Sequence, residues 1–482
     1  MGDYLGVKKM TSENDFGTAV NAGSFRDPSG QIFSRNGTVY RSIFAHGIKE
    51  FVAARDSGVH KKLITDGLLI PHEEVAFGDW APKGTVSCLK HPRIPMVSYP
   101  WEWPFSLLKD AALIHLDAME ALVPSGFWLR DASAFNIQFC REGLCLIDTL
   151  SVGRRIPESP WPAYGQFCAH FLAPLALAAY GDVRTLSMWR NYIDGYPLDL
   201  VVKFLPFWRK CNPGLLMHLI MHARAQNMAD RKEDIGKETS VKKAKVNDRG
   251  LIGILRSLHK TVEGIKWKRT SEVWEEYGEI RTYQPEDVAN KSHYVDRVVK
   301  RLQPEVVWDL GANTGEFSLI AASHGGFVVS IDGDPACTEH IYEKSTKEGD
   351  RGKRILPLTM DLANPSPGLG WRSQERMGLE DRGPADLVLA LALVHHLVLS
   401  SCIPLSLIAE WFGSLGKYLL VEFVPRSDPM VKKLLANRGE EHLPYNLDLF
   451  LADFQKIFDF VDQTDLHNGR LLFLCKLRQE FK

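Results

Sequence analysis

The second half of the chain alternates short apolar runs with amphipathic stretches, and no other feature of the sequence constrains the fold as strongly. Five apolar runs lie at 306–310, 327–331, 355–358, 386–394 and 418–424. Strands that alternate with helices usually form a parallel sheet covered by helices on both faces. We therefore expect an α/β domain over 251–482, with a mostly parallel sheet.

The connection after the first run reads Asp309-Leu-Gly311-Ala-Asn313-Thr-Gly315-Glu316. Glycines at 311 and 315 permit a tight turn and a close approach of backbone to ligand. Asn313 tolerates a left-handed conformation better than most residues. Ligands of open parallel sheets bind outside the carboxyl ends of the strands, so this loop is predicted to contact a ligand.

The second run ends at Asp332, where a carboxylate can accept hydrogen bonds from both hydroxyls of a ribose. The glycine spacing differs from the G-x-G-x-x-G of dinucleotide sites. Asp309 and Glu316 would repel a pyrophosphate but suit a cationic amino-acid group. The combination favours S-adenosylmethionine (SAM), which carries an ammonium and a sulfonium.

These residues resemble class I SAM-dependent methyltransferases. Asp309–Glu316 looks like their first motif, Asp332 like the ribose acid, and Asp361 with Leu362 like the segment beside the adenine. Asn313 departs from the pattern, because many members carry glycine there. The resemblance implies a Rossmann-like fold and SAM as the cofactor.

The chain is most similar to one bacterial family, the nodulation-protein-type methyltransferases, and the likeness spans most of its length. It is carried by the segments 129–139, 147–151, 166–175, 390–397 and 421–425. The family's substrates are not a settled guide to the acceptor.

Three residues are candidates for chemistry at the acceptor. His395 and His396 follow the run 386–394, and Glu422 ends the next run, on the same predicted edge of the sheet. A base is needed only if the acceptor must lose a proton early. Either histidine lines the acceptor pocket or is structural, and the family pattern favours His396. Glu422 binds an acceptor ammonium or hydroxyl, or pairs with a neighbouring Lys or Arg.

The region 21–228 carries a second group of polar residues, Asp131, Asn136 and Asp148. The chain between Asn136 and Asp148 is predicted to form a hairpin with a three-residue loop ending at Gly143. In that register Asn136 lies opposite Asp148. A carboxylate and an amide side by side, below a loop aspartate, are suited to magnesium and phosphate.

This group looks like the catalytic loop and metal-binding strand of protein-kinase-like and aminoglycoside-phosphotransferase-like folds. The resemblance implies an α+β kinase-like domain, with Asp131 as base and Asn136 and Asp148 as metal ligands. ATP with magnesium is then a possible ligand. Three interpretations of this group are open. A kinase-like domain that only binds substrate or has a structural role is favoured over one that transfers phosphate. In the third interpretation, the Asp and Asn side chains only stabilise a turn.

The upstream sequence both supports the kinase-like resemblance and departs from it. Ile94–Tyr99 would be the hinge strand and Ser106–Leu122 the following helix. Residues 30–37 are not a G-x-G-x-x-G loop, and Arg41 stands where the resemblance would place a lysine.

The composition excludes several classes of protein. Fifty-eight basic and 59 acidic residues leave a net charge of −1, which argues against a nucleic-acid-coating protein. The eight cysteines form no CxxC pair, so no metal site is predicted. No apolar run reaches the roughly 18 residues of a membrane span, and we expect a cytoplasmic protein without a membrane partner.

The predicted domains are a flexible N-terminus (1–20), a kinase-like domain (21–228), a charged linker (229–250) and a methyltransferase domain (251–482). We expect methyl transfer from SAM to a small molecule or carrier-bound metabolite in biosynthesis. The alternatives are a bifunctional kinase–methyltransferase and a methyltransferase fold re-used for displacement or ring closure. A small partner subunit or a homo-oligomer is compatible with each.

Overall fold

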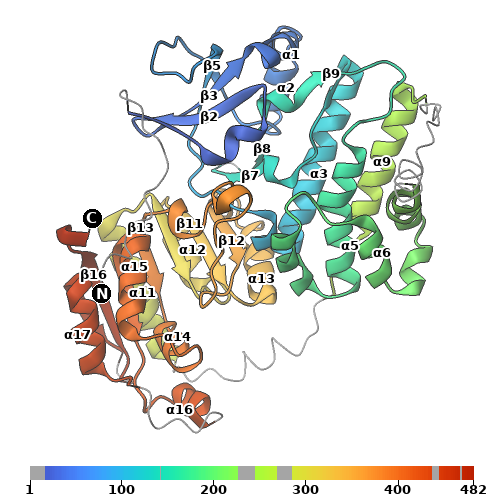
Figure 1. The fold of residues 1–482 in the computed structure, drawn as a ribbon. Coiled ribbons are helices and arrows are strands. Elements are labelled where there is room, and N and C mark those ends of the chain that lie inside the picture. The colour runs from blue at the N-terminus through green and yellow to red at the C-terminus, as the bar shows by residue number, and fades with distance from the viewer. Residues whose placement is uncertain are drawn as a thin grey trace.

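The computed structural model describes residues 17–141, 143–225, 245–268, 285–436, 444–466 and 469–481. They form an N-terminal part, with a small antiparallel sheet above a group of helices, and a C-terminal α/β part beside those helices (Figure 1). Most of the predicted N-terminal segment 1–20 and of the predicted linker 229–250 lies outside the described residues. No helix among the described residues is long and apolar enough to cross a membrane.

The C-terminal part is built on one seven-stranded sheet with the order β12-β11-β10-β13-β14-β16-β15. The first five strands in this order run parallel, and β16 is antiparallel to both of its neighbours, which confirms the predicted mostly parallel α/β sheet. The strands are β10 (Val306–Leu310), β11 (Phe327–Asp332), β12 (Ile355–Thr359), β13 (Ala385–Ala390), β14 (Gly416–Phe423), β15 (Phe458–Asp465) and β16 (Leu471–Leu477).

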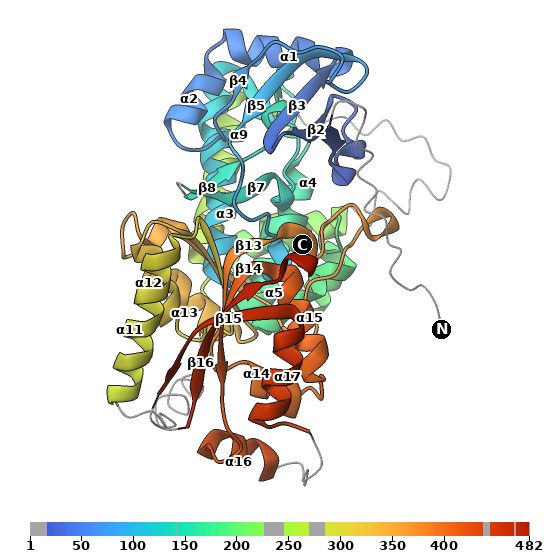
Figure 2. The same cartoon turned by 90° about the vertical axis from the view of Figure 1, so that its left-hand side faces the viewer.

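Helices cover both faces of this sheet, which explains why its parallel strands are mostly apolar. Figure 2 shows α11, α12 and α13 on one face and α14, α15 and α17 on the other. The helices are α11 (Pro285–Leu302), α12 (Glu316–Ser323), α13 (Pro335–Ser345), α14 (Val394–Leu399), α15 (Leu405–Leu415), α16 (Pro429–Ala436) and α17 (Leu447–Ile457).

The strand predicted over 386–394 is shorter than expected. β13 ends at Ala390, the backbone turns through Ala392 at φ 52°, and Val394 begins α14. His395 and His396 therefore lie in the first turn of a helix. A buried strand and a buried helix are both apolar, so the composition of the run contained no boundary between them.

The N-terminal part contains a five-stranded antiparallel sheet, two short two-stranded sheets and a set of helices. Its strands are β1 (Thr18–Val20), β2 (Gly30–Arg35), β3 (Thr38–Phe44), β4 (Glu73–Glu74), β5 (Thr85–His91), β6 (Phe127–Leu129), β7 (Ile137–Cys140), β8 (Gly143–Leu146) and β9 (Val152–Arg154). Its α-helices are α1 (Ala45–Asp56), α2 (Val59–Thr65), α3 (Phe105–Leu122), α4 (Tyr164–Phe167), α5 (Ala173–Tyr180), α6 (Leu198–Phe204), α7 (Pro213–Leu215) and α9 (Asp248–Gly264).

Two details of the predicted N-terminal part are wrong. Cys140 pairs with Gly143, so the β7–β8 loop has two residues, and Asn136 lies opposite Ile147, whose N–H donates to its carbonyl over 2.8 Å. The expected hinge strand 94–99 has no strand conformation, because the strand in this place, β5, ends at His91. Hairpin register depends on loop length, and a loop shorter by one residue shifts every cross-strand pair.

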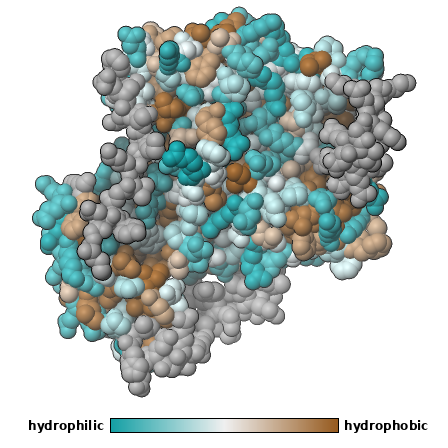
Figure 3. Space-filling view, in the orientation of Figure 1, coloured by the Kyte–Doolittle hydropathy of each residue, from teal (hydrophilic) through white to brown (hydrophobic). Residues whose placement is uncertain are grey.

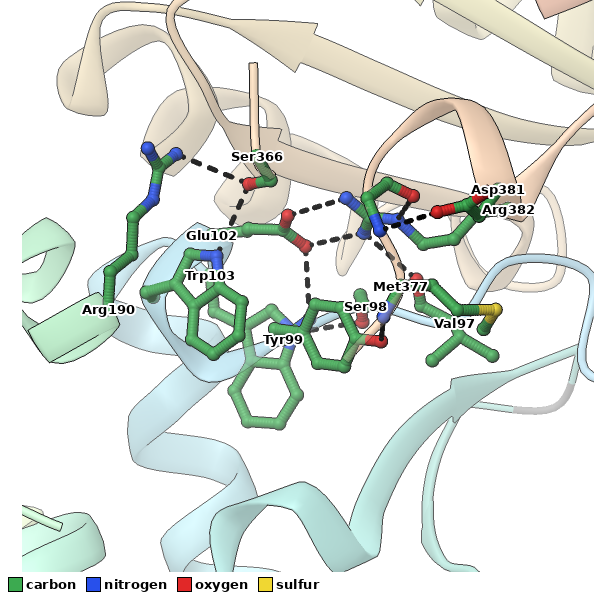
Figure 4. Close-up of polar contacts among 12 residues, drawn as sticks. Val97, Ser98, Tyr99, Glu102, Trp103, Arg190, Ser366, Met377, Asp381 and Arg382 are labelled. Carbon is green, nitrogen blue, oxygen red and sulfur yellow. Dashed lines mark hydrogen bonds and ion pairs between the residues drawn. The ribbon is translucent and has the colours of Figure 1, made fainter. Parts of the chain in front are cut away.

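The two parts share a buried interface (Figure 4). The carboxylate of Glu102 accepts two hydrogen bonds of 2.8 Å from Arg382, and both side chains are fully buried. Trp101 and Arg190 of the N-terminal part both donate to Ser366. The hydrophobic core is continuous across this contact, so the β12–β13 connection of the α/β sheet packs firmly against the N-terminal part.

The helix α9 packs against the N-terminal part. Leu251, Leu255, Leu258 and Val262 are buried, and α9 packs against α3 and α7 of the N-terminal part. Most of α9 lies in the predicted methyltransferase domain (251–482), although it packs on the N-terminal part. The division into domains itself remains a prediction.

Candidate functional site

The loop between β10 and α12 has the conformation that its sequence predicted. Gly311, Asn313 and Gly315 have φ values of 75°, 49° and 73°, all in the left-handed region. A Cβ atom at Gly315 would lie 2.9 Å from Cγ1 of Ile341, so this position has neither the backbone conformation nor the space for a side chain. The loop therefore requires these residue types to keep its shape.

Asp332 lies at the end of β11, beside this loop. Its two carboxylate oxygens accept hydrogen bonds from the backbone N–H groups of Asn313, at 2.8 Å, and Asp334, at 2.9 Å. Burial raises the pKa of Asp332, and the two N–H groups oppose that rise. Backbone donors thus fix the orientation of this carboxylate before any ligand binds.

Asp309 lies behind the loop rather than in the open. It is 1% exposed and accepts a hydrogen bond of 2.6 Å from the Ser318 hydroxyl, which accepts one of 2.7 Å from Ser330. Burial raises the pKa of Asp309 to about 6. These contacts make Asp309 an anchor between β10, β11 and α12.

The segment predicted beside the adenine meets the same edge of the sheet. The Met360 N–H donates to the Asp332 carbonyl over 2.8 Å, which brings the end of β12 alongside β11. Asp361 is exposed and accepts a hydrogen bond from the Ala363 N–H, whereas Leu362 is 8% exposed. The predicted cofactor residues thus come together from three neighbouring connections.

The two histidines after β13 differ in accessibility. His395 is buried, and its Nδ1 has no hydrogen-bond partner among the described residues. Burial, followed by His396 and Arg470, lowers the pKa of His395 to about 3, so its ring is neutral near pH 7. His396 is exposed, with its ring 4.2 Å from that of His395 between centroids. Of the two, His396 is the ring that an acceptor can reach.

Glu422 is fully buried and already paired with cations. Lys291 donates to it over 2.5 Å and Arg470 over 3.1 Å. Burial alone would raise the pKa of Glu422, but the two cations outweigh burial and hold it below its ordinary value. The sequence contained no local signal for this network, because Lys291 and Arg470 lie far from Glu422 in the chain.

A cavity of about 990 Å³ lies mostly in the N-terminal part, and its wall includes Asp131, Asn136 and Asp148. The structure therefore brings the three predicted residues to one cleft, despite the different hairpin register. Its wall also contains Asp27 and Arg41, and sequence reasoning missed Asp27 because it lies more than 100 residues upstream.

Arg41 lies between two of the cleft carboxylates. Its guanidinium is 2.7 Å from Asp27 and 2.9 Å from Asp148. Burial raises the pKa of Asp148, and Arg41 opposes this effect. Asp131 accepts a hydrogen bond of 2.8 Å from the Ser133 N–H. An arginine thus neutralises the carboxylate that the kinase-like resemblance implies as a metal ligand.

The described residues do not form a ready metal site. They contain no group of three or more His, Cys, Asp and Glu side chains that could hold a metal ion. The side-chain nitrogen of Asn136 is buried and has no partner among them. The prediction of ATP with magnesium in this cleft therefore remains a prediction.

One wall of the cleft belongs to the C-terminal part. Arg26 donates to Glu375 over 2.6 Å, and the Arg376 guanidinium lies 4.3 Å from the centroid of the Phe135 ring. Both Glu375 and Arg376 lie in the β12–β13 connection, which contains Asp361 near its start, at the predicted cofactor edge. One connection therefore borders both candidate sites.

Comparison with solved structures finds partial likeness at low identity. The magnesium protoporphyrin IX methyltransferase ChlM from Synechocystis PCC 6803, with bound SAH, is 17% identical and covers 43% of this chain and 95% of its own (TM-score 0.31). The N-methyltransferase NodS from Bradyrhizobium japonicum WM9 is 10% identical over 39% of this chain and 96% of its own (TM-score 0.29). The bifunctional kinase–methyltransferase WbdD is 16% identical and covers 40% of this chain and 38% of its own (TM-score 0.27).

Sequence comparison gives a longer match. No protein-family model matches the chain. The nodulation protein NoeA from Rhizobium meliloti (strain 1021) is 34% identical over 442 residues, which are 89% of this chain and 90% of the relative. The predicted family is thereby confirmed, and the chain belongs to the family of the nodulation protein NoeA.

Proposed function

We propose that the chain is a SAM-dependent methyltransferase that acts on a small molecule or a carrier-bound metabolite in biosynthesis. The observation that carries this proposal is the preorganised pair formed by the 311–315 loop and Asp332. The loop is left-handed at Gly311, Asn313 and Gly315, with Asn313 exposed, and Asp332 is oriented by two backbone N–H groups. The strand order reverses beside β10, between β11 and β13, and ligands of open α/β sheets bind at such a reversal.

The residues present suit SAM at this edge of the sheet. Asp332 would bind the ribose hydroxyls, Leu362 would contact the adenine, and the backbone of Gly311–Gly315 would bind the amino-acid portion. Bound SAM supplies an electrophilic methyl group. The chain contributes by positioning the acceptor for in-line attack, which accounts for much of the acceleration of such displacements.

His396 is the candidate for proton transfer at the acceptor. It is exposed at the carboxyl end of β13, where the neutral ring of an accessible histidine can accept a proton from a hydroxyl or ammonium. Glu422 acts instead as a structural carboxylate, since Lys291 and Arg470 already pair with it.

Calorimetric titration with SAM tests the proposal. Asp332→Ala removes the ribose acceptor, and we expect the affinity to fall at least about tenfold, the equivalent of about 1.4 kcal/mol. Asp350→Ala removes an exposed aspartate of the same chain and should bind as the wild type does. Wild-type protein that does not bind SAM, or an Asp332→Ala variant of unchanged affinity, would refute the proposal.

The product of SAM identifies the reaction. Methyl transfer releases S-adenosylhomocysteine, whereas displacement or ring closure at the amino-acid chain of SAM releases methylthioadenosine. We expect S-adenosylhomocysteine, with turnover reduced in His396→Ala and SAM affinity retained. Release of methylthioadenosine would refute methyl transfer and support the non-methylating alternative.

Nucleotide binding in the N-terminal cleft is the second candidate function, as in a bifunctional kinase–methyltransferase. It is favoured by the shared cavity of Asp131, Asn136 and Asp148, and it requires Arg41 to release Asp148 or to contact the phosphates itself. ATP with Mg²⁺ should bind the wild type and bind Asp148→Asn more weakly. If no ATP binds to the wild-type protein, this second function is excluded.

A further inference from the structure

The segment 203–225, on the far side of the N-terminal part from its small sheet, exposes an unusual number of large apolar side chains. They project from the end of α6, from the 3₁₀ helix Phe207–Cys211 and from the π-helix Leu216–Met221, and the π-helix contacts the other two. The exposed fractions are Phe204 62%, Phe207 80%, Trp208 73%, Met217 55% and Met221 58%. We call these side chains, together with the basic residues of the same segment, the basic-aromatic surface. Hydrophobic side chains reach the molecular surface on the side of α5 and α6 (Figure 3).

The charged residues within this segment are all basic. Residues 203–225 contain four basic residues and no Asp or Glu: Lys203, Arg209, Lys210 and Arg224. Lys203 pairs with Asp199 over 3.2 Å at the edge of the surface, and the Arg209 guanidinium lies 4.3 Å from the Tyr180 ring centroid. Within a chain of net charge −1, this surface is a local basic patch.

We propose that the basic-aromatic surface binds the headgroup region of an anionic lipid bilayer. Trp and Phe are enriched at membrane–water interfaces, and Lys and Arg near a bilayer are attracted to anionic lipids. Phe207 and Trp208 are among the most exposed large apolar side chains and lie between Lys203 and Lys210 in sequence. Such a contact lies on the membrane and needs no spanning helix. It departs from the expectation of no membrane partner, which rested on the lack of a long apolar run.

The charge pattern disfavours a second copy of the chain as the occupant. A two-fold symmetric dimer through this surface would bring the same patch of each copy together, and basic residues would face basic residues. Like charges placed opposite one another oppose association. A bilayer with anionic headgroups complements the patch in both polarity and charge.

Vesicle flotation with the full-length protein tests the proposal. The wild type should float with phosphatidylcholine vesicles that contain about 30 mol% phosphatidylglycerol, and much less with phosphatidylcholine alone or at high salt. Phe207→Ser with Trp208→Ser should weaken binding about tenfold or more. Lys203→Gln with Lys210→Gln should weaken binding to anionic vesicles and reduce its dependence on salt.

The control variant is Leu407→Ser with Leu449→Ser, which removes two exposed apolar side chains from α15 and α17 in the C-terminal part. It should float as the wild type does, and circular dichroism should show all variants folded. The proposal is overturned if the wild type does not float with anionic vesicles, or if the Phe207/Trp208 variant floats equally well. Sedimentation velocity that shows a dimer lost in that variant, without vesicle binding, would assign the surface to a second copy.

Discussion

Asp332 and Asp148 are partly buried carboxylates at the two candidate sites, and the protein holds them by opposite means. Two backbone N–H groups orient Asp332. Asp148 faces the guanidinium of Arg41 at 2.9 Å, and Arg41 also contacts Asp27. Burial raises the pKa of both carboxylates, and different groups oppose that rise.

This difference bears on what each site can bind. The two backbone N–H groups orient the Asp332 carboxylate without an opposing formal charge, so a ligand that donates hydrogen bonds to it need not displace them. A buried guanidinium cancels most of that charge, so a cationic ligand at Asp148 would compete with Arg41. The C-terminal site is therefore prepared for a ligand, whereas the N-terminal cleft must rearrange or bind its ligand through other groups.

Gly315→Val tests whether the backbone conformation of the loop beside Asp332 is needed for binding. A β-branched residue at φ 73° adopts an unfavourable conformation, and its Cβ would lie 2.9 Å from Ile341. We expect SAM affinity to fall about 100-fold, measured by calorimetry. Gly349→Val carries a similar conformational cost at φ 60° with no atom within 4 Å, and should retain binding. Equal affinities of the two variants would contradict a role of loop shape in binding.

Arg41→Met tests whether the ion pairs of Arg41 with Asp27 and Asp148 stabilise the fold. Removal of the guanidinium leaves two carboxylates without their cation, and we expect the free energy of unfolding to fall by about 2 kcal/mol at pH 7. Arg41→Lys should lose less, because it keeps the charge. Urea titration measures both variants.

The pH dependence of Arg41→Met follows from Asp148. The pKa of this carboxyl is already raised in the folded protein and rises further without Arg41, so the folded state binds the proton more tightly than the unfolded state. The loss of stability should therefore shrink as the pH falls from 7 toward 4. A loss that is the same at both pH values would show that Arg41 acts through packing alone.

The smallest expected effect concerns Asp309, a buried carboxylate for which burial outweighs the hydrogen bonds that it accepts from Ser318. Its pKa in the folded protein is about 6, against an ordinary value of 3.8, so the folded state favours the protonated form. Stability from this group therefore increases as the pH falls through 6. Relative to Asp309→Asn, the wild type should gain about 1 kcal/mol in the free energy of unfolding between pH 7 and pH 5. An unchanged difference between wild type and variant would mean that Asp309 is ionised throughout this range.

The predictable part of the candidate site is the part that depends on short-range structure. Gly311, Asn313 and Gly315 indicated a left-handed loop, and the position of Asp332 at the end of a strand indicated a carboxylate beside it. The alternation of strands and helices indicated the parallel sheet. Backbone conformation and strand ends depend on neighbouring residues, which a single sequence contains.

The parts that could not be predicted depend on packing between distant segments. Nothing local linked Glu422 to Lys291 and Arg470, or indicated that His395 is buried while His396 is exposed. The sequence by itself determined the α/β alternation, the glycine loop and the acid beside it. Only the tertiary structure decided which charges meet across the sheet and which wall of the N-terminal cleft the β12–β13 connection forms. The physical reason is that ion pairs and burial arise from contacts between segments far apart in the chain, and no local pattern of residues encodes them.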